Sequence, residues 1–560
     1  MNLRHLQAIG LLDGLDVRFA RALGRLGRTD DDRVLLAAAL ANRAPRVGDV
    51  GIELRAAHAL STDEHPLELP DPEAWEEAVR ACTSLVRTPH EPRRTPLVWA
   101  EGALYLDRIW DYQRRLADAV RARLEAPPPP VDEAALRGEL DAQFPADPRT
   151  ALQRRAAEVA VRGRLTMVVG GPGTGKTAVV AKLLTLLGEA RTVLVAPTGK
   201  AAARLSESLR ASAGPTEAST LHRCLGLRPG DPRPRHGPES PLAADVVVVD
   251  EASMVDLPLM TKLFEAVPPQ ARLILLGDPD QLVSVELGSV LGDLCRVDTG
   301  PLAHARVRLE HTWRYAPDSG IGRLAEAIRT GDVDAATQAL TTHADLTWVR
   351  EPPSTEDLAS ALVDGYRPVF DAEDPGDALR ALRGFRVLCA HRRGRLGVDG
   401  VQLLARRALE EAALTPSAAV HRGLPLMVTR NDARLGVYNG DVGVVHPDPA
   451  ADGALRLWLE QQGAPRSVGL ALVPEHVPVY ATTVHKSQGS EYEHVYVLLP
   501  DRPSPLLTRE LLYTAVTRAR RHVTLIGRPE LVESAIRTVT RRMSGLPRML
   551  DGSREGYNDV

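Results

Sequence analysis

The chain has 560 residues, of which 44% are hydrophobic and 25% charged, and this length and composition favour a globular protein with several domains. The formal net charge of −4 argues against a protein that passively coats nucleic acid, but not against a motor whose basic residues line one groove. Because no apolar run could span a bilayer, the N-terminus does not resemble a signal peptide and no two of the four cysteines have metal-ligand spacing, we expect a cytoplasmic protein with reduced cysteines.

The first 125 residues predict a helical domain. They are rich in Ala, Leu and Arg, and they contain no phosphate-binding loop, metal cluster or nucleophile motif. The proline run APPPPVD, residues 126–132, cannot continue a helix and is typical of a stiff linker. We therefore predict one domain over residues 1–125, followed by a linker and lead-in over residues 126–149.

Short apolar runs rich in β-branched residues alternate with helical segments over residues 150–300. Because each run is apolar on both faces, it is typical of a strand buried inside a parallel sheet. The alternation predicts an α/β domain with a doubly wound parallel sheet. The runs are LTMVVGG, VLVAPT, DVVVVDE and RLILLGD, which begin at residues 165, 193, 245 and 272.

A second α/β domain of the same kind is predicted over residues 301–545. Its strands are expected in FRVLCAH, YATTVHK, HVYVLLP and HVTLIG, which begin at residues 385, 480, 494 and 522. Residues 420–480 are rich in short strands and predict a small β-barrel inserted into this domain. Residues 546–560 predict a polar, frayed tail.

The sequence GGPGTGKT, residues 170–177, lies between a predicted strand and a helix, as a phosphate-binding loop requires. Glycines would let backbone N–H groups surround the phosphates, Lys176 would bridge the β- and γ-phosphates, and the Thr177 hydroxyl would bind Mg²⁺. A Gly-rich turn can also be a purely structural loop, but the complete GKT ending favours a nucleotide site. The predicted nucleotide contacts in this loop are Gly171, Pro172, Gly173, Thr174, Gly175, Lys176 and Thr177.

Two adjacent carboxylates follow the most apolar predicted strand. Asp250 and Glu251 could be two solvated acids in a turn, but a buried strand that ends in two acids has little structural use. We predict that Asp250 holds Mg²⁺ through water and that Glu251 activates the attacking water. The loop and this pair together predict nucleoside triphosphate hydrolysis, and they leave its purpose open.

Four further segments resemble motifs of superfamily 1 helicases: TALQRRAAEVA from residue 150, GDPDQLVSVELGSVLGDL from 277, HTWRYAPDSGI from 311 and YTAVTRARRHVTLIG from 513. The resemblance implies two RecA-like motor domains, with ATP bound between them. It also implies that Gln153 contacts the adenine and that Gln281 responds to the γ-phosphate. Trp313 and Tyr315 each fit either a contact with adenine or a place in the core. The arginine fingers implied by the resemblance are Arg314 and Arg518.

Three other segments resemble the DNA-contacting motifs of that superfamily: APTGKAAARLSE from residue 196, STLHRCLG from 219 and ATTVHKSQGSEY from 481. A grip on phosphates would tolerate any base sequence. If ATP closes the two domains and hydrolysis reopens them, each domain binds the DNA in turn, and the protein moves stepwise along the strand. The residues predicted to contact nucleic acid, or to link it to the nucleotide, are Thr198, Lys200, Thr220, His222, Thr483, His485, Lys486, Ser487 and Gln488.

As a set, the motifs are most similar to those of the RecD family, the alpha subunits of bacterial exodeoxyribonuclease V, or RecBCD. ALYLDRIWDYQRRLADAV, from residue 103, resembles the segment that precedes the motor in that family. The resemblance implies a 5′-to-3′ helicase that acts on single-stranded DNA and duplex ends. It also implies a RecB-like helicase–nuclease partner and a RecC-like scaffold partner, with residues 1–125 as the docking domain. Such a complex processes double-strand breaks and degrades linear DNA.

Three alternatives stay open at this point. A stand-alone RecD-like helicase would share the motifs, although such relatives usually carry an N-terminal helix-hairpin-helix extension that this sequence does not show. A non-motor NTPase switch would not need the segments from residues 481 and 513. An RNA helicase is not excluded, because phosphate contacts distinguish the two sugars poorly.

Overall fold

The computed structural model describes residues 3–61, 66–213, 217–228, 230–283, 286–316, 318–432, 434–461 and 463–551. Residues 552–560 of the predicted tail, and residues 284–285 and 317 of the predicted motifs, lie outside the described residues. No described helix is long and apolar enough to cross a membrane.

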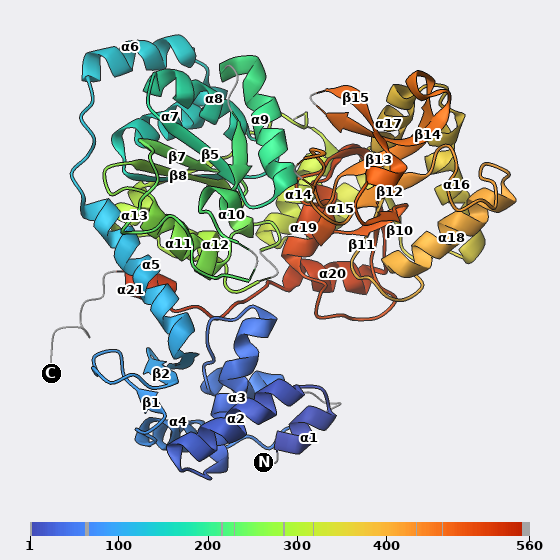
Figure 1. Ribbon diagram of the computed structural model, residues 1–560. Helices are drawn as coiled ribbons and strands as arrows, with labels where there is room; N and C mark the ends of the chain where they lie inside the picture. The colour runs from blue at the N-terminus through green and yellow to red at the C-terminus, as the bar shows by residue number, and fades with distance from the viewer. Residues whose placement is uncertain are drawn as a thin grey trace.

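The N-terminal part, residues 3–106, packs around its own hydrophobic core (Figure 1). Trp75 and Leu97 are fully buried in this core. The prediction of a helical domain was incomplete, because residues 86–106 form a three-stranded sheet. Its elements are α1 (Leu3–Ala8), α2 (Gly14–Gly27), α3 (Asp32–Arg43), α4 (Pro72–Ala81), β1 (Val86–Arg87), β2 (Leu97–Ala100) and β3 (Ala103–Leu106), with 3₁₀ turns at Ala44–Val47 and Arg55–Leu60.

The first large sheet has six strands in the order β6-β5-β7-β8-β4-β9, and every neighbouring pair is parallel. The strands are β4 (Leu165–Gly170), β5 (Thr192–Ala196), β6 (Ala218–Thr220), β7 (Val246–Val249), β8 (Arg272–Gly277) and β9 (Arg306–Leu309). The four strands predicted for residues 150–300 are therefore confirmed, and β6 and β9 were not anticipated. Both unpredicted strands are short and lie at the edges of the sheet, where the apolar signal is weak.

Helices cover both faces of this sheet, which explains why its strands are apolar throughout. On β7, Val246 and Val248 face one helical layer while Val247 and Val249 face the other. One layer contains α6 (Glu133–Gln143), α7 (Ala151–Arg162), α8 (Lys176–Leu187) and α9 (Gly199–Ala213). The other contains α5 (Asp107–Glu125), α10 (Leu221–Cys224), α11 (Leu257–Ala266), α12 (Val290–Arg296), α13 (Gly300–His304) and α21 (Leu546–Leu550).

The second large sheet is also parallel, in the order β10-β19-β18-β11-β17. Its strands are β10 (Leu346–Val349), β11 (Phe385–Cys389), β17 (Ala481–Thr483), β18 (Tyr492–Leu498) and β19 (Ala519–Ile526). On one face pack α14 (Gly320–Thr330), α15 (Val333–Thr342), α19 (Arg509–Val516) and α20 (Pro529–Arg537). On the other pack α16 (Thr355–Asp371), α17 (Pro375–Gly384) and α18 (Val398–Glu411).

The strand-rich insertion is an open antiparallel sheet, in the order β15-β14-β13-β12-β16. The edge strands β15 and β16 do not pair with each other within the described residues, so the predicted closed barrel is not formed there. One side of this sheet packs on the core around α16 and α17. The strands are β12 (Pro425–Val428), β13 (Val442–Asp448), β14 (Ala454–Gln461), β15 (Ala464–Gly469) and β16 (His476–Pro478).

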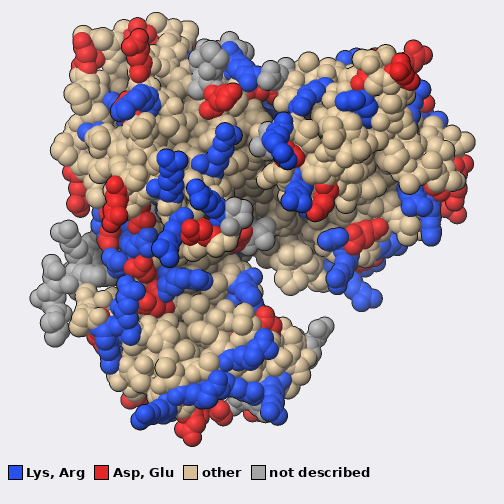
Figure 2. Space-filling view, in the orientation of Figure 1, with Lys and Arg blue, Asp and Glu red and all other residues tan. Residues whose placement is uncertain are grey.

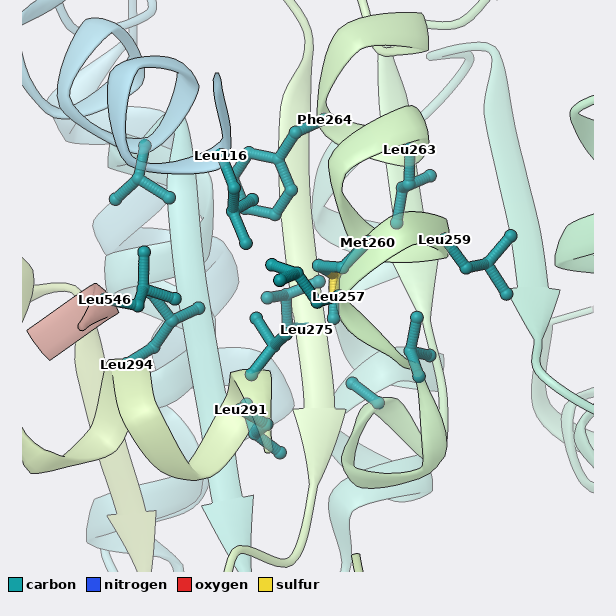
Figure 3. Packing of buried hydrophobic residues seen from close by; sticks show 14 of the residues in the cluster. Leu116, Leu257, Leu259, Met260, Leu263, Phe264, Leu275, Leu291, Leu294 and Leu546 are labelled. Atoms are coloured by element: carbon teal, nitrogen blue, oxygen red, sulfur yellow. The ribbon is translucent and has the colours of Figure 1, made fainter. Parts of the chain in front are cut away.

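Three predicted boundaries are wrong. The helix α5 packs against α11, which covers one face of the first large sheet, and Figure 3 shows Leu116 and Phe264 at this contact. Residues 107–125 therefore belong to the first α/β part and not to the N-terminal part. The strand β9 pairs with β4, so the first α/β part extends to Leu309. Residues 546–550 form α21, which lies beside α5, because its apolar side chains Leu546, Met549 and Leu550 pack into the core that contains α5.

Candidate nucleotide site and nucleic-acid contacts

The phosphate-binding loop joins β4 to α8. Gly173 and Gly175 have φ of 78° and 87°, a left-handed conformation that glycine adopts without strain. Lys176 is the first residue of α8, and its Nζ donates to the carbonyl oxygens of Gly170 and Gly171 at 2.6 and 2.9 Å. The loop thus places the lysine and the N-terminus of a twelve-residue helix together, which is an arrangement that binds phosphate.

Gln153 supports this loop from α7. Its side chain is buried, and Nε2 donates to the carbonyl oxygen of Thr174 at 3.1 Å. A Cβ atom on Gly175 would lie 2.3 Å from the same Nε2, so the glycine also makes room for the amide. The structure therefore brings Gln153 to the phosphate-binding loop, and its contact with adenine stays a prediction.

Asp250 and Glu251 follow β7 at the same edge of the sheet as the loop. Burial, and then the charge of Glu251, raise the pKa of Asp250 to about 6, while the nearby Lys176 opposes this shift. Glu251 has φ of 51°, an unusual conformation for a residue with a side chain, and its N–H donates to Asp250 Oδ1 at 2.9 Å. The bond from the Glu251 N–H thus holds the Asp250 carboxylate in place at this edge of the sheet.

The two residues predicted to hold Mg²⁺, Thr177 and Asp250, would both bind it through oxygen atoms. Thr177 supplies a hydroxyl and Asp250 a carboxylate, which suit a hard cation. No cluster of three or more His, Cys, Asp or Glu side chains that could hold a metal ion occurs in the described part of the chain. This set fits Mg²⁺, which commonly takes one or two protein ligands and completes its shell with water and substrate phosphate.

A buried chain of hydrogen bonds crosses from the first sheet to the second. Arg518, which is 3% exposed, donates through Nη2 to Gln281 Oε1 at 3.0 Å. Gln281 Nε2 donates to Asp278 Oδ2 at 2.9 Å, and the Tyr513 hydroxyl donates to the same oxygen at 3.3 Å. Sequence reasoning missed Asp278 and Tyr513, although a buried acid directly after β8 is the same signal that identified Asp250.

Arg314 lies between the phosphate-binding loop and the second sheet. Its Nη1 donates to the carbonyl oxygen of Thr517 at 2.8 Å, and its Nη2 contacts Glu491 Oε1 at 2.6 Å. The backbone N–H of the neighbouring Trp313 donates to the carbonyl oxygen of Gly173 at 2.8 Å. The structure therefore brings both predicted arginine fingers, Arg314 and Arg518, into the interface that the phosphate-binding loop faces.

The two aromatic candidates beside Arg314 have different environments. Tyr315 is buried in the core of the second part, and its hydroxyl donates to the carbonyl oxygen of Ala519 at 2.8 Å. Trp313 is 47% exposed, lies edge-on to His311 and has the Arg149 guanidinium 5.4 Å from its ring centre. Of the two, only Trp313 is positioned to pack against a nucleotide base.

These groups surround one cleft of about 610 Å³ between the two large sheets. The phosphate-binding loop forms one wall, and residues of the second part form the other. Lys176, Asp250, Glu251, Gln281, Arg314 and Arg518 all line it. The cleft brings together every predicted catalytic residue, so it is the candidate site of hydrolysis.

The residues predicted to contact nucleic acid lie at the carboxyl ends of β5, β6 and β17 and in the segments that directly follow these strands. Lys200 Nζ donates to Ser490 Oγ at 2.7 Å and to the carbonyl oxygen of Gly440 at 3.2 Å, across the two parts. Gln488 Nε2 donates to the carbonyl oxygen of Leu282 at 2.8 Å, beside Gln281. Ser487 is buried and donates to the carbonyl oxygen of Val484 at 2.7 Å, which makes it a structural residue in this conformation.

The other predicted contacts remain accessible. His222 and Lys486 are exposed, and Thr198, Thr220, Thr483 and His485 are partly exposed. The hydroxyls of Thr198, Thr220 and Thr483 each accept a hydrogen bond from the backbone N–H three positions further along the chain. Figure 2 shows basic side chains interspersed with acidic ones on the face it presents, and no uniformly basic surface covers that face.

Three family models match successive parts of the chain. They describe the RecBCD enzyme subunit RecD, N-terminal domain (residues 8–105), an AAA domain (residues 153–287) and a UvrD-like helicase C-terminal domain (residues 478–526). The RecBCD enzyme subunit RecD of Mycolicibacterium smegmatis is 41% identical, over 96% of this chain and 98% of its own length. The chain belongs to the RecD family.

Other relatives show how far the RecD family similarity extends. The RecBCD enzyme subunit RecD of Haemophilus influenzae is 31% identical over 86% of this chain and 85% of its own length. The ATP-dependent RecD2 DNA helicase of Deinococcus radiodurans is 33% identical over 75% of this chain but only 54% of its own length. A crystal structure of a Bacteroides Pif1 helicase with ADP-AlF3 and ssDNA matches 70% of this chain and 94% of the Pif1 chain. The sequence identity is 19% and the TM-score is 0.39, and this similarity is too low to transfer a mechanism.

Proposed function

We propose that this RecD-family chain is an ATP-dependent 5′-to-3′ DNA helicase, and that it is the motor subunit of a RecBCD-type helicase–nuclease complex. It would process double-strand DNA breaks for recombinational repair and degrade linear DNA together with its partners. The two α/β parts would act as RecA-like motor domains, and the N-terminal part as a docking domain.

The observation that carries this proposal is the hydrogen bond between Arg518 and Gln281 across the nucleotide cleft. It joins the second part directly to the loop after β8 in the first part. Phosphate charge between Lys176 and the two arginines Arg314 and Arg518 would attract both walls of the cleft. ATP binding would then close the two parts, and hydrolysis would release them.

Each group in the cleft has a task in hydrolysis. Bound Mg²⁺ would neutralise charge on the β- and γ-phosphates, and Thr177 and Asp250 would be the residues that hold it. Glu251 would orient and deprotonate the attacking water, and Lys176 would hold the β- and γ-phosphates. The two arginines would stabilise the charge that develops on the transferring phosphoryl group.

Coupling to DNA is supported by contacts that link the predicted DNA loops to the cleft. Gln488 bonds the loop beside Gln281, and Lys200 bonds Ser490, whose carbonyl oxygen accepts from Arg518 Nη1 at 3.4 Å. Binding or loss of the γ-phosphate would therefore be passed, through the hydrogen bonds of Gln488, Lys200 and Arg518, to the segments that carry Thr198, Thr483 and Lys486. These contacts would be mainly to phosphates, and so independent of base sequence.

The partners are proposed from the family. The relatives from M. smegmatis and H. influenzae are named as RecBCD subunits, and this chain covers 98% and 85% of their lengths. A RecB-like helicase–nuclease and a RecC-like scaffold would form a heterotrimer with this chain. The stand-alone alternative is represented by the D. radiodurans helicase, of which the chain spans about half.

Unwinding of tailed duplexes tests this function. Matched duplexes carrying either a 5′ or a 3′ single-stranded tail would be incubated with ATP and Mg²⁺, using the purified chain and the chain co-purified with its partners. We expect unwinding only from the 5′ tail, and none with Lys176→Ala. Unwinding from the 3′ tail would refute the polarity, and full activity without partners would favour the stand-alone alternative.

A further inference from the structure

One carboxylate in the cleft contacts three arginines from three different segments. Glu491 accepts from Arg314 Nη2 at 2.6 Å and from Arg520 Nε at 2.9 Å, and it also forms an ion pair with Arg204. Arg204 lies on α9 of the first part, Arg520 lies on β19 of the second, and Arg314 lies in the segment between β9 and α14. This carboxylate therefore joins the walls of the cleft at a place separate from the bond between Arg518 and Gln281.

Glu491 is largely shielded from solvent and stays ionised. Its side chain is 9% exposed. Burial alone would raise its pKa, but the charges of Arg314 and Arg204, with the hydrogen bonds of Arg204 and Arg520, lower the pKa to about 2. The carboxylate is thus negatively charged throughout the working range of pH.

Asp250 and Glu251, the two acids that follow β7, do not share this task. Asp250 and Glu251 form no ion pair within the described residues, whereas Glu491 forms ion pairs with Arg204, Arg314 and Arg520. Without Glu491, guanidinium groups held this close in a partly buried cleft would repel one another. The negative charge therefore makes it possible to keep several arginines beside the phosphate-binding loop.

Contacts fix Arg314 on two sides. The carbonyl oxygen of Thr517 accepts from Nη1 and Glu491 accepts from Nη2, so the plane of the guanidinium is defined by two bonds. A Cβ atom on Gly173 of the phosphate-binding loop would lie 2.4 Å from Arg314 Cβ. A guanidinium has five N–H donors, so these bonds leave others available for a phosphate oxygen.

We propose that Glu491 is a positioning residue for hydrolysis, which orients the Arg314 guanidinium toward the transferring phosphate and links α9 of the first part to β19 of the second. This inference rests on the proposed function, because it requires Arg314 to act on the γ-phosphate. It assigns Glu491 a task that acts through Arg314 and not through direct chemistry. Loss of the charge should therefore slow turnover more than it weakens ATP binding.

The test compares three variants of the full-length protein. Glu491→Gln keeps the shape but removes the charge, and Glu491→Asp keeps the charge at a shorter reach. Glu493→Gln is the matched control, because Glu493 is two residues away, is more exposed and pairs with the exposed Arg521. The measurements are kcat and KM for ATP hydrolysis with saturating single-stranded DNA, the affinity for a non-hydrolysable ATP analogue, and the unfolding temperature.

We expect Glu491→Gln to lower kcat by about 10- to 100-fold, as misplacement of a catalytic group does, and to change the analogue affinity by less than about threefold. Glu491→Asp should fall between this variant and the wild type, and Glu493→Gln should match the wild type. A wild-type kcat in Glu491→Gln would overturn the proposal. A parallel loss of kcat, analogue affinity and unfolding temperature would also overturn it, by showing a purely structural role.

A double-mutant cycle with Arg314→Ala tests whether Glu491 acts through that arginine. If it does, the double variant should hydrolyse ATP as slowly as Arg314→Ala alone. Additive losses would overturn the proposal. If the wild-type protein itself did not hydrolyse ATP with DNA present, the proposed function would fail instead, so the two failures are distinguishable.

Discussion

Arg518 and Gln281 are joined by a hydrogen bond of 3.0 Å, although 237 positions separate them in the sequence. Arg518 ends the loop after α19 in the second part, and Gln281 follows β8 in the first. Gln281 also donates to Asp278, which fixes its side chain within the loop after β8. This pair is a direct bond between the two parts at the nucleotide site.

Lys176→Ala should reduce ATP hydrolysis by at least about 100-fold, because the ammonium group that neutralises the transferring phosphate is lost. The fold should survive, since Lys176 bonds only carbonyl oxygens within its own loop. Steady-state hydrolysis with DNA, together with the circular dichroism spectrum, checks both statements. Unchanged turnover would refute the site assignment.

Arg518→Ala should lower kcat by about 10³-fold while leaving ATP affinity within a few fold, because an arginine finger acts mainly on transition-state charge. Arg521→Ala is the control, since that side chain is 84% exposed and pairs only with Glu493 among the described residues. Rapid-quench turnover and equilibrium binding separate the two effects. A collapse of affinity with little change in the rate would contradict this role.

Trp313→Ala should weaken ATP binding by about 1 kcal/mol, or roughly fivefold, with kcat nearly unchanged, because the exposed ring is available to pack on the base. Tyr315→Phe should leave ATP affinity unchanged, since Tyr315 is buried away from the cleft. KM for ATP in the two variants checks this prediction. Equal KM values in Trp313→Ala and the wild type would show that the ring does not contact the nucleotide.

Gln113→Leu should destabilise the C-terminal segment. Gln113 is fully buried on α5 and accepts from the Gly545 N–H at 3.0 Å, so the variant leaves a buried N–H unpaired at a cost of about 1–3 kcal/mol. Limited trypsin cleavage near Arg541 should become faster, and the unfolding temperature should fall. Arg114→Leu, at an exposed position on the same helix, should change neither; equal cleavage rates in Gln113→Leu and wild type would count against the anchoring role.

The sequence alone determined the parts of the site that depend on short segments. The phosphate-binding loop and the pair Asp250 and Glu251 could be predicted because an apolar strand, a turn and a helix follow one another within a few residues, and parallel strands bring their carboxyl ends to one edge. The similarity to known motifs added Gln281, Arg314 and Arg518, which all line the cleft and whose catalytic roles stay predictions.

Only the tertiary structure decided the features that depend on distant packing. Trp313 and Tyr315 are two residues apart and look equivalent in the sequence, but the packing of Tyr315 against β19 buries one and leaves the other exposed. Likewise, Leu546 is buried because α5, more than 400 positions earlier, provides an apolar surface. Local pattern fixes what a segment can form, whereas burial and charge pairing depend on which distant segments it meets.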